Sequence, residues 1–570
     1  MTSDQPNTVG RRTFFTYLAS LGIAAAAADT LWAEAEKQGA VTPGALAQAE
    51  KIAGIELTDA QREMMLDGVE ELARKYAAIR AVPLDNAVAP ALHFDPVLPG
   101  TSFGRERRPP VMSPQPRLAR PANLEELAFA PVTVLAELVR SRQVRSLELT
   151  ELSLARLKQL NPSLNCVVTL TEERALAQAE RSDREIAAGG HRGPLHGIPW
   201  GAKDLLAVKG YPTTWGASPY QHQVIDEDAT VVQRLDEAGA VLVAKLTLGS
   251  LANGDIWFGG QTCSPWNLNE GSSGSSAGPA AAVVAGLVGF AIGTETRGSI
   301  LSPCTRCGAT GLRPTFGRVS RAGAMALAWS MDKVGPICRS VEDCALVLAA
   351  IAGPDGRDET VVDLPFNWDA RRDVRTLRVG YLKSIFERQP SNTDDPEWYG
   401  LDLAAVEALR SLGVELVPIE LPDLPIDALS FILNVEAAAA FDELTRSGRD
   451  RLLVRQGKND WPNRFRVARM VPAVEYLQAN RVRRLAMAEM RRILAGLDVY
   501  VSPTYGGTNL PLTNLTGHPA VVLPDGFRDN GTPVSITFMG NLFAEAEALL
   551  LAKAYQDATG FHLRRPPLFT

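Results

Sequence analysis

Cysteine and histidine are both scarce in this sequence, with six of each among 570 residues. So few cysteines exclude a fold that is held together by a disulfide framework. The pair Cys304 and Cys307, even when combined with Cys338 and Cys344, lacks the gaps of a zinc site, and the histidines show no metal-ligand spacing. We therefore expect buried thiols, or one oxidised pair at Cys304 and Cys307, and neither a metal nor an organic cofactor.

The sequence also lacks an excess of positive charge and an apolar run long enough to cross a bilayer. Lys and Arg number 58 against 65 Asp and Glu, which gives a net charge of −7, and the two signs are mixed along the chain. No basic field is available to neutralise a phosphate backbone, so we expect no nucleic-acid partner. Past the N-terminus the longest apolar stretch, residues 280–292, is too short for a membrane span. It is predicted to be a buried helix, without stable membrane insertion.

The N-terminus has the order of a twin-arginine export signal. Arg11 and Arg12 come first, an apolar-leaning run follows at 14–28, and small residues at 33–35 suit a cleavage site. We assign residues 1–35 to this signal and expect an exported protein, periplasmic or secreted. The alternative is an amphipathic helix that stays attached, in which case the protein is cytoplasmic.

The rest of the chain favours an α/β fold with a mixed central β-sheet that is covered by helices on both faces, and with an N-terminal helical extension. Residues 36–120 contain a helix at 57–76, started by a capping box of Thr58 and Gln61, and a Pro-rich extended strap over 81–121. Residues 121–570 form the main domain, in which hydrophobic periodicity predicts alternating strands and helices. The predicted strands are at 166–170, 197–208, 240–245, 377–381 and 497–501, and the predicted helices are at 132–140, 147–160, 172–188, 229–238 and 401–412. Asn161-Pro162 is predicted to stop the second of these helices.

Three glycine-rich stretches carry reactive side chains: Lys203 in the first, Ser275 and Ser276 in the second, and Ser299 in the third. Glycine lets backbone N–H groups approach a developing oxyanion without obstruction by side chains. Lys203 lies in an apolar alternation, where burial favours the neutral amine, and a pKa shift of about three units, or roughly 4 kcal/mol, makes it half neutral at pH 7. A neutral lysine can withdraw a proton from one serine, which withdraws it from the nucleophile, in place of histidine.

These stretches, taken in order, resemble the amidase signature family, and the similarity runs from about residue 131 to residue 561. The resemblance implies that Ser299 is the nucleophile and Lys203 the base, with a bridging serine between them. Of the two Ser-Ser pairs, ungapped alignment back from Ser299 favours Ser275 with Ser276 beside it. The resemblance also implies a cis peptide bond between Gly274 and Ser275.

By the same resemblance, the backbone N–H groups of Thr296, Arg297, Gly298 and Ser299 form the oxyanion hole. The chain departs from the family pattern here, because Arg297 replaces a glycine, Glu295 an aspartate and Leu301 an arginine. Arg297 could replace the lost arginine as a structural partner of Glu295. Our hypothesis is instead that Arg297 points into the pocket and binds a substrate carboxylate or carbonyl.

The expected activity is hydrolysis of a carboxylic amide through an acyl-enzyme at Ser299, with a small-molecule amide as substrate. Ester or carbamate cleavage uses the same machinery, and both an A-type amidotransferase subunit and a catalytically dead scaffold homologue stay open. A Gly-x-Ser-x-Gly elbow at Ser276, with His518 or His562 as base, needs a strand directly before it, where this chain is polar. The pocket is expected to be shaped by 249–274 and 360–480, and a homodimer stays open.

Overall fold

The computed structural model describes residues 41–83, 92–114, 119–388 and 396–569. The chain is divided into two compact units, Met1–Lys75 and Tyr76–Thr570. The predicted export signal lies outside the described residues, and its cleavage and the resulting location stay predictions.

The described part of the first unit contains helix α3 (Pro43–Ala53) and most of α4 (Asp59–Arg80). The Thr58 backbone N–H donates to Gln61 at 2.8 Å and the Gln61 N–H donates back to the Thr58 hydroxyl at 3.3 Å, so the predicted capping box is confirmed. The Arg62 guanidinium of α4 joins the two helices through an ion pair of 2.6 Å with Glu50 on α3, and it forms a second ion pair of 2.6 Å with Asp59 on its own helix.

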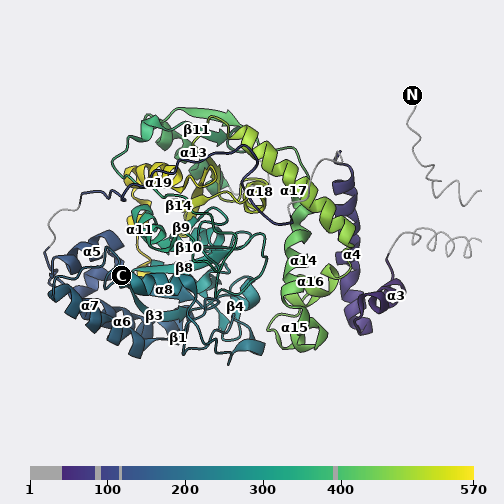
Figure 1. Ribbon diagram of the computed structural model, residues 1–570, viewed down its shortest axis with the longest axis horizontal. Helices are drawn as coiled ribbons and strands as arrows, with labels where there is room; N and C mark the ends of the chain where they lie inside the picture. Colours follow the sequence, from purple (N-terminus) through teal and green to yellow (C-terminus); the bar gives the residue numbers. More distant parts are fainter. Residues whose placement is uncertain (1–40, 84–91, 115–118, 389–395, 570) are drawn as a thin grey trace, which may run out of the picture. The chain divides into compact units, whose positions relative to one another are not determined.

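The second unit is built on an eleven-stranded mixed sheet with the order β1-β3-β2-β8-β10-β9-β14-β15-β13-β11-β12. Strand β2 pairs in parallel with β3 and β8, and β11 pairs in parallel with β12 and β13, whereas the other pairings are antiparallel. The strands follow one another from β1 at the bottom to β11 near the top of Figure 1. Their bounds are Val167–Leu170 (β1), Pro199–Lys203 (β2), Val241–Leu246 (β3), Phe290–Glu295 (β8), Thr310–Arg313 (β9), Lys333–Cys338 (β10), Val379–Leu382 (β11), Leu416–Ile419 (β12), Val499–Pro503 (β13), Ala520–Phe527 (β14) and Pro533–Gly540 (β15).

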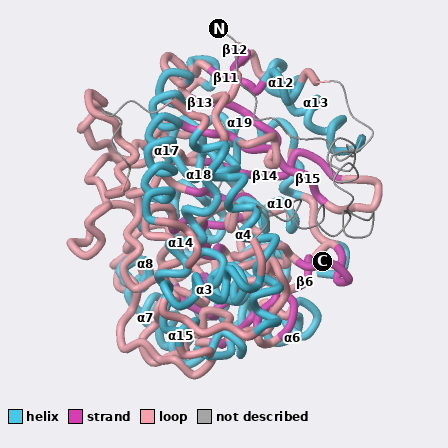
Figure 2. Tube along the Cα trace, turned by 90° about the vertical axis from the view of Figure 1, so that its right-hand side faces the viewer, coloured by secondary structure: helices cyan, strands magenta, loops and turns pink. Residues whose placement is uncertain are grey.

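Helices cover this sheet (Figures 1 and 2), so the predicted α/β fold class is confirmed. Helix α9 packs against α10, and α11 packs against α19, with all four contacting the strands. A separate group of helices forms where α14 contacts α16 and α17. The main helices are α5 (Val132–Arg140), α6 (Ser146–Leu164), α7 (Glu172–Ala187), α8 (Thr230–Glu237), α9 (Ala277–Val284), α10 (Leu301–Cys307), α11 (Val341–Ile351), α13 (Pro396–Ser411), α14 (Phe431–Ala440), α16 (Trp461–Ala468), α17 (Ala473–Ile493), α18 (Asn509–Thr516) and α19 (Glu545–Thr559).

The Pro-rich strap is extended where the structure describes it, as predicted, and it lies along the second unit. Val111 donates its backbone N–H to the Trp368 carbonyl at 2.8 Å and accepts from Ala370 at 2.9 Å. Phe94 packs edge-on against Phe316 with ring centroids 4.8 Å apart. These contacts hold residues 92–114 against the rest of the second unit.

Three predicted elements are wrong in their extent. The strand predicted at 197–208 is much shorter, because β2 spans only Pro199–Lys203. The apolar run 280–292 is not one helix, because α9 ends at Val284, Gly286 adopts a left-handed φ of 69°, and the chain continues as strand β8. Periodicity cannot separate a buried helix from a buried strand when every residue is apolar. Helix α6 also continues past Pro162 to Leu164, since the left-handed Asn165 ends it.

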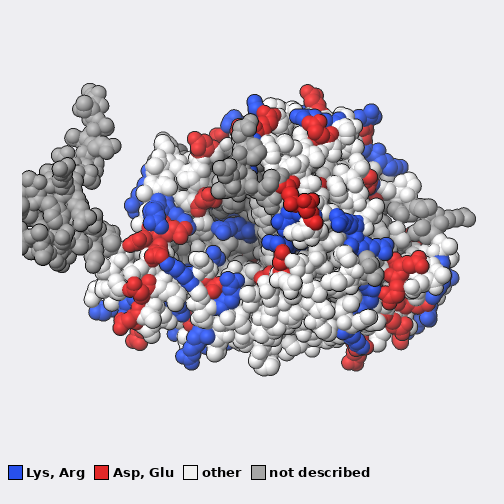
Figure 3. All heavy atoms as spheres, turned by 180° about the vertical axis from the view of Figure 1, so that it is seen from behind, with Lys and Arg blue, Asp and Glu red and all other residues white. Residues whose placement is uncertain are grey.

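Acidic and basic side chains are interspersed on the face shown in Figure 3, without a large area of one sign. Among the helices that the structure describes, none has the length and apolarity that a membrane span requires.

A buried ion pair connects Asp204, the residue directly after β2, with Lys245 on β3. The Lys245 ammonium lies 2.7 Å from the Asp204 carboxylate, and both side chains are 0% exposed. Lys245 also donates to the Pro212 carbonyl at 2.9 Å and to the Thr213 hydroxyl at 2.7 Å. Removal of one partner of such a pair leaves an uncompensated buried charge, which is far more costly than loss of a surface pair.

We predict that Asp204→Asn destabilises the protein by roughly 3–5 kcal/mol, because the Lys245 ammonium loses its buried counterion. The matched control is Glu106→Gln, which breaks an Arg108 pair whose side chains are 67% and 70% exposed and which should leave the stability almost unchanged. Calorimetric melting of both variants checks this, and equal falls in Tm would contradict it.

Candidate active site

The candidate catalytic residues meet at one edge of the sheet because of its parallel strands. Strand β2 ends at Lys203, its parallel neighbour β8 ends at Glu295, and Ala202 pairs with Ile292. The carboxyl ends of parallel strands open at the same edge, where α/β folds gather functional groups. Helix α9 begins at Ala277, so Ser275 and Ser276 immediately precede it at this edge.

The Lys203 amine is enclosed by hydroxyl and carbonyl oxygens. It donates to the Ser275 hydroxyl at 2.8 Å, the Ser276 hydroxyl at 3.0 Å and the Thr294 hydroxyl at 2.9 Å. The side chain is buried, and no described carboxylate forms an ion pair with it. Desolvation by burial lowers the pKa of Lys203 to about 7, although the more distant carboxylates of Asp332 and Glu295 oppose the shift.

The peptide bond between Gly274 and Ser275 is cis, which confirms the expectation from the resemblance. Glycine is required before it, because a Cβ at Gly274 would lie only 1.9 Å from the Gly254 carbonyl oxygen. The Ser276 hydroxyl donates to the Thr294 carbonyl at 3.1 Å and accepts from the Thr294 N–H at 3.2 Å. This serine is therefore held by strand β8 as well as by Lys203.

Ser299 is brought next to the other two serines by its backbone. Its carbonyl accepts a hydrogen bond of 3.0 Å from the Ser276 N–H. The Ser299 hydroxyl itself makes no hydrogen bond with any residue that the structure describes, so a direct Ser275–Ser299 bond is not present in this structure. No described residue accepts from the backbone N–H groups of 296–299 either. Gly298 has a φ of 111°, a conformation that favours glycine.

Glu295 anchors the loop that follows it, and its partner is not Arg297. One carboxylate oxygen accepts from Arg313 at 2.8 Å and from Asn514 at 2.9 Å, both buried. The other accepts from the backbone N–H groups of Ile300 at 2.8 Å and Leu301 at 3.0 Å. The carboxylate therefore fixes both ends of residues 296–301, and Arg313 takes the pairing that Arg297 was considered for.

Arg297 makes no hydrogen bond or ion pair within the described part of the chain. Arg297 is exposed as a residue, but neighbouring atoms displace water from its guanidinium group. This loss of hydration lowers the pKa of Arg297 from the ordinary value, while the Asp427 carboxylate opposes the shift. Arg297 does not line the cavity described below. Whether it binds substrate stays a hypothesis.

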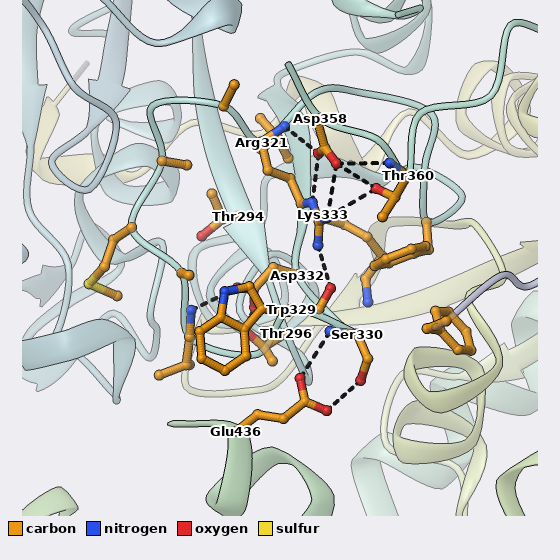
Figure 4. Close-up of a pocket in the computed structure, with 18 of the residues that line it drawn as sticks. Thr294, Thr296, Arg321, Trp329, Ser330, Asp332, Lys333, Asp358, Thr360 and Glu436 are labelled. Carbon is orange, nitrogen blue, oxygen red and sulfur yellow. Dashed lines mark hydrogen bonds and ion pairs between the residues drawn. The ribbon is translucent and has the colours of Figure 1, made fainter. Parts of the chain in front are cut away.

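A cavity of about 640 Å³ borders these residues through Thr294 and Thr296 (Figure 4). The Thr296 hydroxyl donates to Asp332 at 2.6 Å. Lys203, Ser275 and Ser299 are not among the lining residues. The segments that we expected to shape the pocket, 249–274 and 360–480, contribute only part of its wall, namely Ala252, Thr360, Val435, Glu436, Ala439 and Tyr476. Most of the wall comes from 321–334 and from the strap.

Asp332 and Lys333 were not singled out from the sequence. The available signal is a charged doublet at the start of an otherwise apolar strand, since Asp332 precedes β10 and Lys333 is its first residue. Lys333 is 3% exposed and lines the cavity. Charged residues placed there are unusual, since an isolated buried charge is costly.

The histidine and cysteine alternatives gain no support. The Ser276 hydroxyl contacts Lys203 and Thr294, whereas His518 bonds the Thr516 hydroxyl at 2.8 Å, and burial lowers the pKa of His518 to about 3. Strand β7 (Asn267–Gly271) does precede the serines, but it pairs only with β6 (Cys263–Ser264) in a two-stranded sheet. All six cysteines are free thiols in this structure, Cys304 and Cys307 included.

Comparison with known proteins agrees with this geometry. The amidase family profile matches residues 148–549. The A-type subunit of the glutamyl-tRNA(Gln) amidotransferase from Methylococcus capsulatus is 36% identical over 481 residues, which covers 76% of this chain and 98% of the relative. The counterpart from Marinomonas sp. is 34% identical over 77% of this chain and 98% of its own length.

Solved structures give the same result. The native peptide amidase of Stenotrophomonas maltophilia superposes with a TM-score of 0.68 at 31% identity, over 78% of this chain and 99% of that one. A 6-aminohexanoate cyclic dimer hydrolase bound to its substrate superposes with a TM-score of 0.67 at 26% identity, over 78% and 100%. By sequence and by structure, this chain belongs to the amidase signature family.

Proposed function

We propose that this protein hydrolyses a carboxylic amide through an acyl-enzyme at Ser299, with Ser275 and Lys203 as the proton relay. The observation that carries the proposal is the Lys203 amine, which is buried without a carboxylate partner among the described residues and bonded to the Ser275 hydroxyl at 2.8 Å. An amine with a pKa near 7 is matched to proton transfer at neutral pH.

In the first half-reaction, the Ser275 hydroxyl gives its proton to the neutral Lys203 amine and takes the proton of the Ser299 hydroxyl. The Ser299 oxygen then bonds to the amide carbon, and the carbonyl oxygen becomes an oxyanion. Collapse breaks the C–N bond, and the proton returns through Ser275 to the departing amine. Water repeats the sequence in place of Ser299 to release the acid.

The Ser275–Ser299 step needs a contact that the structure does not show as a hydrogen bond. The two residues are nevertheless linked through the Ser276 N–H and the Ser299 carbonyl at 3.0 Å. Catalytic hydrogen bonds are often long in resting enzymes and tighten when substrate is bound. The relay requires the hydroxyl groups of Ser275 and Ser299 to come within hydrogen-bond distance of each other.

The oxyanion would be stabilised by backbone N–H groups of Thr296, Arg297, Gly298 and Ser299. Their lack of acceptors among the described residues supports this role, because an oxyanion hole needs donors that are free and already in place. Glu295 supports it by holding the loop at Ile300 and Leu301.

The second candidate is an A-type amidotransferase subunit, which the name of the Methylococcus capsulatus relative favours. The two activities share the acyl-enzyme step, but an amidotransferase subunit passes ammonia to a further acceptor. The peptide amidase likeness and the mixed surface charge of Figure 3 support a stand-alone amidase. Ester or carbamate cleavage would use the same residues.

A fluorophosphonate should label Ser299, and Lys203→Ala should lower both the labelling rate and kcat on aryl amides by about 10²–10⁴-fold, the usual contribution of a positioned base. Mass mapping of the adduct locates the label. Lys209→Ala is the control, because Lys209 is a surface lysine paired with Asp226 at 3.3 Å. Hydrolysis by the isolated chain supports the amidase, and absence of labelling contradicts both enzymatic proposals and favours the dead homologue.

The pH dependence follows from the protonation of Lys203. Because only the neutral amine acts as a base, kcat/KM should be small below the pKa of Lys203, which burial lowers to about 7, and should rise to a plateau above it. Stopped assays on both sides of neutral pH measure the midpoint. A profile that stays flat across neutral pH, or falls as pH rises, would contradict Lys203 as the base.

Arg297 is proposed to bind a polar or anionic group of the substrate outside the cavity, on the side of the departing amine. Arg297→Ala should therefore lower kcat/KM about tenfold or more for amides whose amine part carries a carboxylate, and less for neutral amides. Arg297→Lys serves as the charge-preserving comparison. Equal losses on both substrate classes would reject a recognition role.

A further inference from the structure

We propose that Lys333 forms an anion subsite at the wall of the cavity, which selects amides whose acyl part carries a carboxylate. The substrate class would then be half-amides of dicarboxylic acids with an apolar spacer. The choice of an amide rests on the proposed function, whereas the anion rests on the contacts of Lys333 itself.

The first observation is that the Lys333 amine is buried with its hydrogen-bonding capacity largely unused. The side chain is 3% exposed and donates to one acceptor, the Met331 carbonyl, within the described part of the chain. No carboxylate of a described residue forms an ion pair with it. An ammonium has three donors, and buried donors without acceptors are costly, so an acceptor supplied by a ligand would stabilise this site.

Apart from the exposed Glu359, the other charged side chains that line the cavity have partners among the described residues. Arg321 is bound to Asp358 at 2.8 Å, with further bonds to Thr360 and to the Trp329 carbonyl, as the dashed lines of Figure 4 show. Glu436 accepts from the Ser330 N–H at 2.9 Å and from the Ser330 hydroxyl at 2.6 Å.

Asp332 is satisfied in the same way, because it accepts from the backbone N–H groups of Leu327 and Ala328 as well as from Thr296. Arg357, at the same cavity, pairs with Glu227 at 2.6 Å. Among the titratable side chains that line the cavity, Lys333 is thus the buried one whose contacts with described residues leave most of its hydrogen-bond donors unsatisfied.

The electrostatic surroundings of Lys333 favour an added negative charge. Desolvation places the pKa of Lys333 well below the ordinary value, and the guanidinium groups of Arg313 and Arg483 lower it further, while Glu295 and Asp332 oppose them. Arg313 and Arg483 are themselves bonded, to Glu295 and to Ser330 respectively. A bound carboxylate would stabilise the charged amine, so binding should draw a proton from solution.

The remainder of the cavity is suited to an apolar spacer. Its wall includes Leu205, Met325, Leu327, Val334, Phe94 and Phe316. The cavity reaches the catalytic residues at Thr294, which bonds Lys203 at 2.9 Å. During turnover the acyl part stays attached to Ser299 while the amine departs, so a buried cavity is better placed to hold the acyl part.

The kinetic experiment compares mono-4-nitroanilides of glutaric to suberic acid with the anilides of monocarboxylic acids of equal chain length. The wild type should favour the carboxylated member of at least one pair about tenfold or more in kcat/KM. Lys333→Met should remove that preference and keep activity on the neutral anilides, and Lys333→Arg should restore part of it. Lys209→Met is the control variant.

A binding experiment decides the inference without turnover. Calorimetric titration of the Ser299→Ala protein with suberamic acid and with octanamide should show tighter binding of the acid by about tenfold or more, lost when Lys333→Met is added. Titration in buffers of different ionisation enthalpy should show proton uptake that Lys333→Met abolishes.

The two failures are separable. Equal binding of the acid and the amide, or a preference that survives Lys333→Met, would overturn the anion subsite whatever the catalytic results. Absence of fluorophosphonate labelling and of any amide hydrolysis would overturn the proposed function, while the titration would still decide the subsite. A Lys333→Met protein that keeps the labelling rate of the wild type shows that the catalytic residues remain folded.

Discussion

The chemistry proposed for this protein depends on an amine that is buried without a counterion among the described residues. Lys203 is surrounded by the hydroxyl groups of Ser275, Ser276 and Thr294, which accept hydrogen bonds but bring no negative charge. A carboxylate at the same distance would hold the lysine in its charged form, in which it cannot accept a proton. The fold therefore has to satisfy the donors of the amine while keeping carboxylates out of contact with it.

The neighbouring lysine on β3 shows the opposite solution. Lys245 lies one strand away and is equally buried, but Asp204 lies 2.7 Å from it. Asp204 directly follows Lys203 in the sequence, so one peptide unit separates an amine kept without a counterion from the carboxylate that neutralises its neighbour. This arrangement uses the parallel pairing of β2 and β3 to hold the Lys203 backbone rigidly. Glu295 gives comparable support on β8 through Arg313 and Asn514.

Much of the fold was predictable because the sequence patterns that indicate these helices and strands lie within the elements themselves. Helix α4 follows its capping box, and β1, β3, α5 and α7 lie within a few residues of their predicted bounds. The candidate roles of Lys203 and the serines followed from the family resemblance that the three glycine-rich stretches carry, and the same resemblance implied the cis bond before Ser275.

What escaped prediction depends on contacts between distant segments. The strand β8 was hidden in an apolar run, and only its pairing with β2 and β10 distinguishes it from a continuation of α9. The pairing of Glu295 with Arg313 required knowledge that β8 and β9 both lie beside β10. The charged doublet of Asp332 and Lys333 marked an unusual position, but it did not indicate the role proposed for Lys333, because the unsatisfied donors are a property of the cavity rather than of the surrounding sequence. The absence of a Ser275–Ser299 hydrogen bond likewise concerns side-chain geometry, which no sequence pattern encodes.

The strap has a consequence for how this chain can differ from its relatives. Phe94 lies outside the stretch 148–549 that carries the family pattern, yet its ring forms part of the cavity wall and packs against Phe316. Substitutions in this appended segment can thus reshape the ligand chamber while every strand of the catalytic scaffold stays unaltered. To that extent, substrate selectivity and catalysis can be changed by substitutions in different segments of the chain.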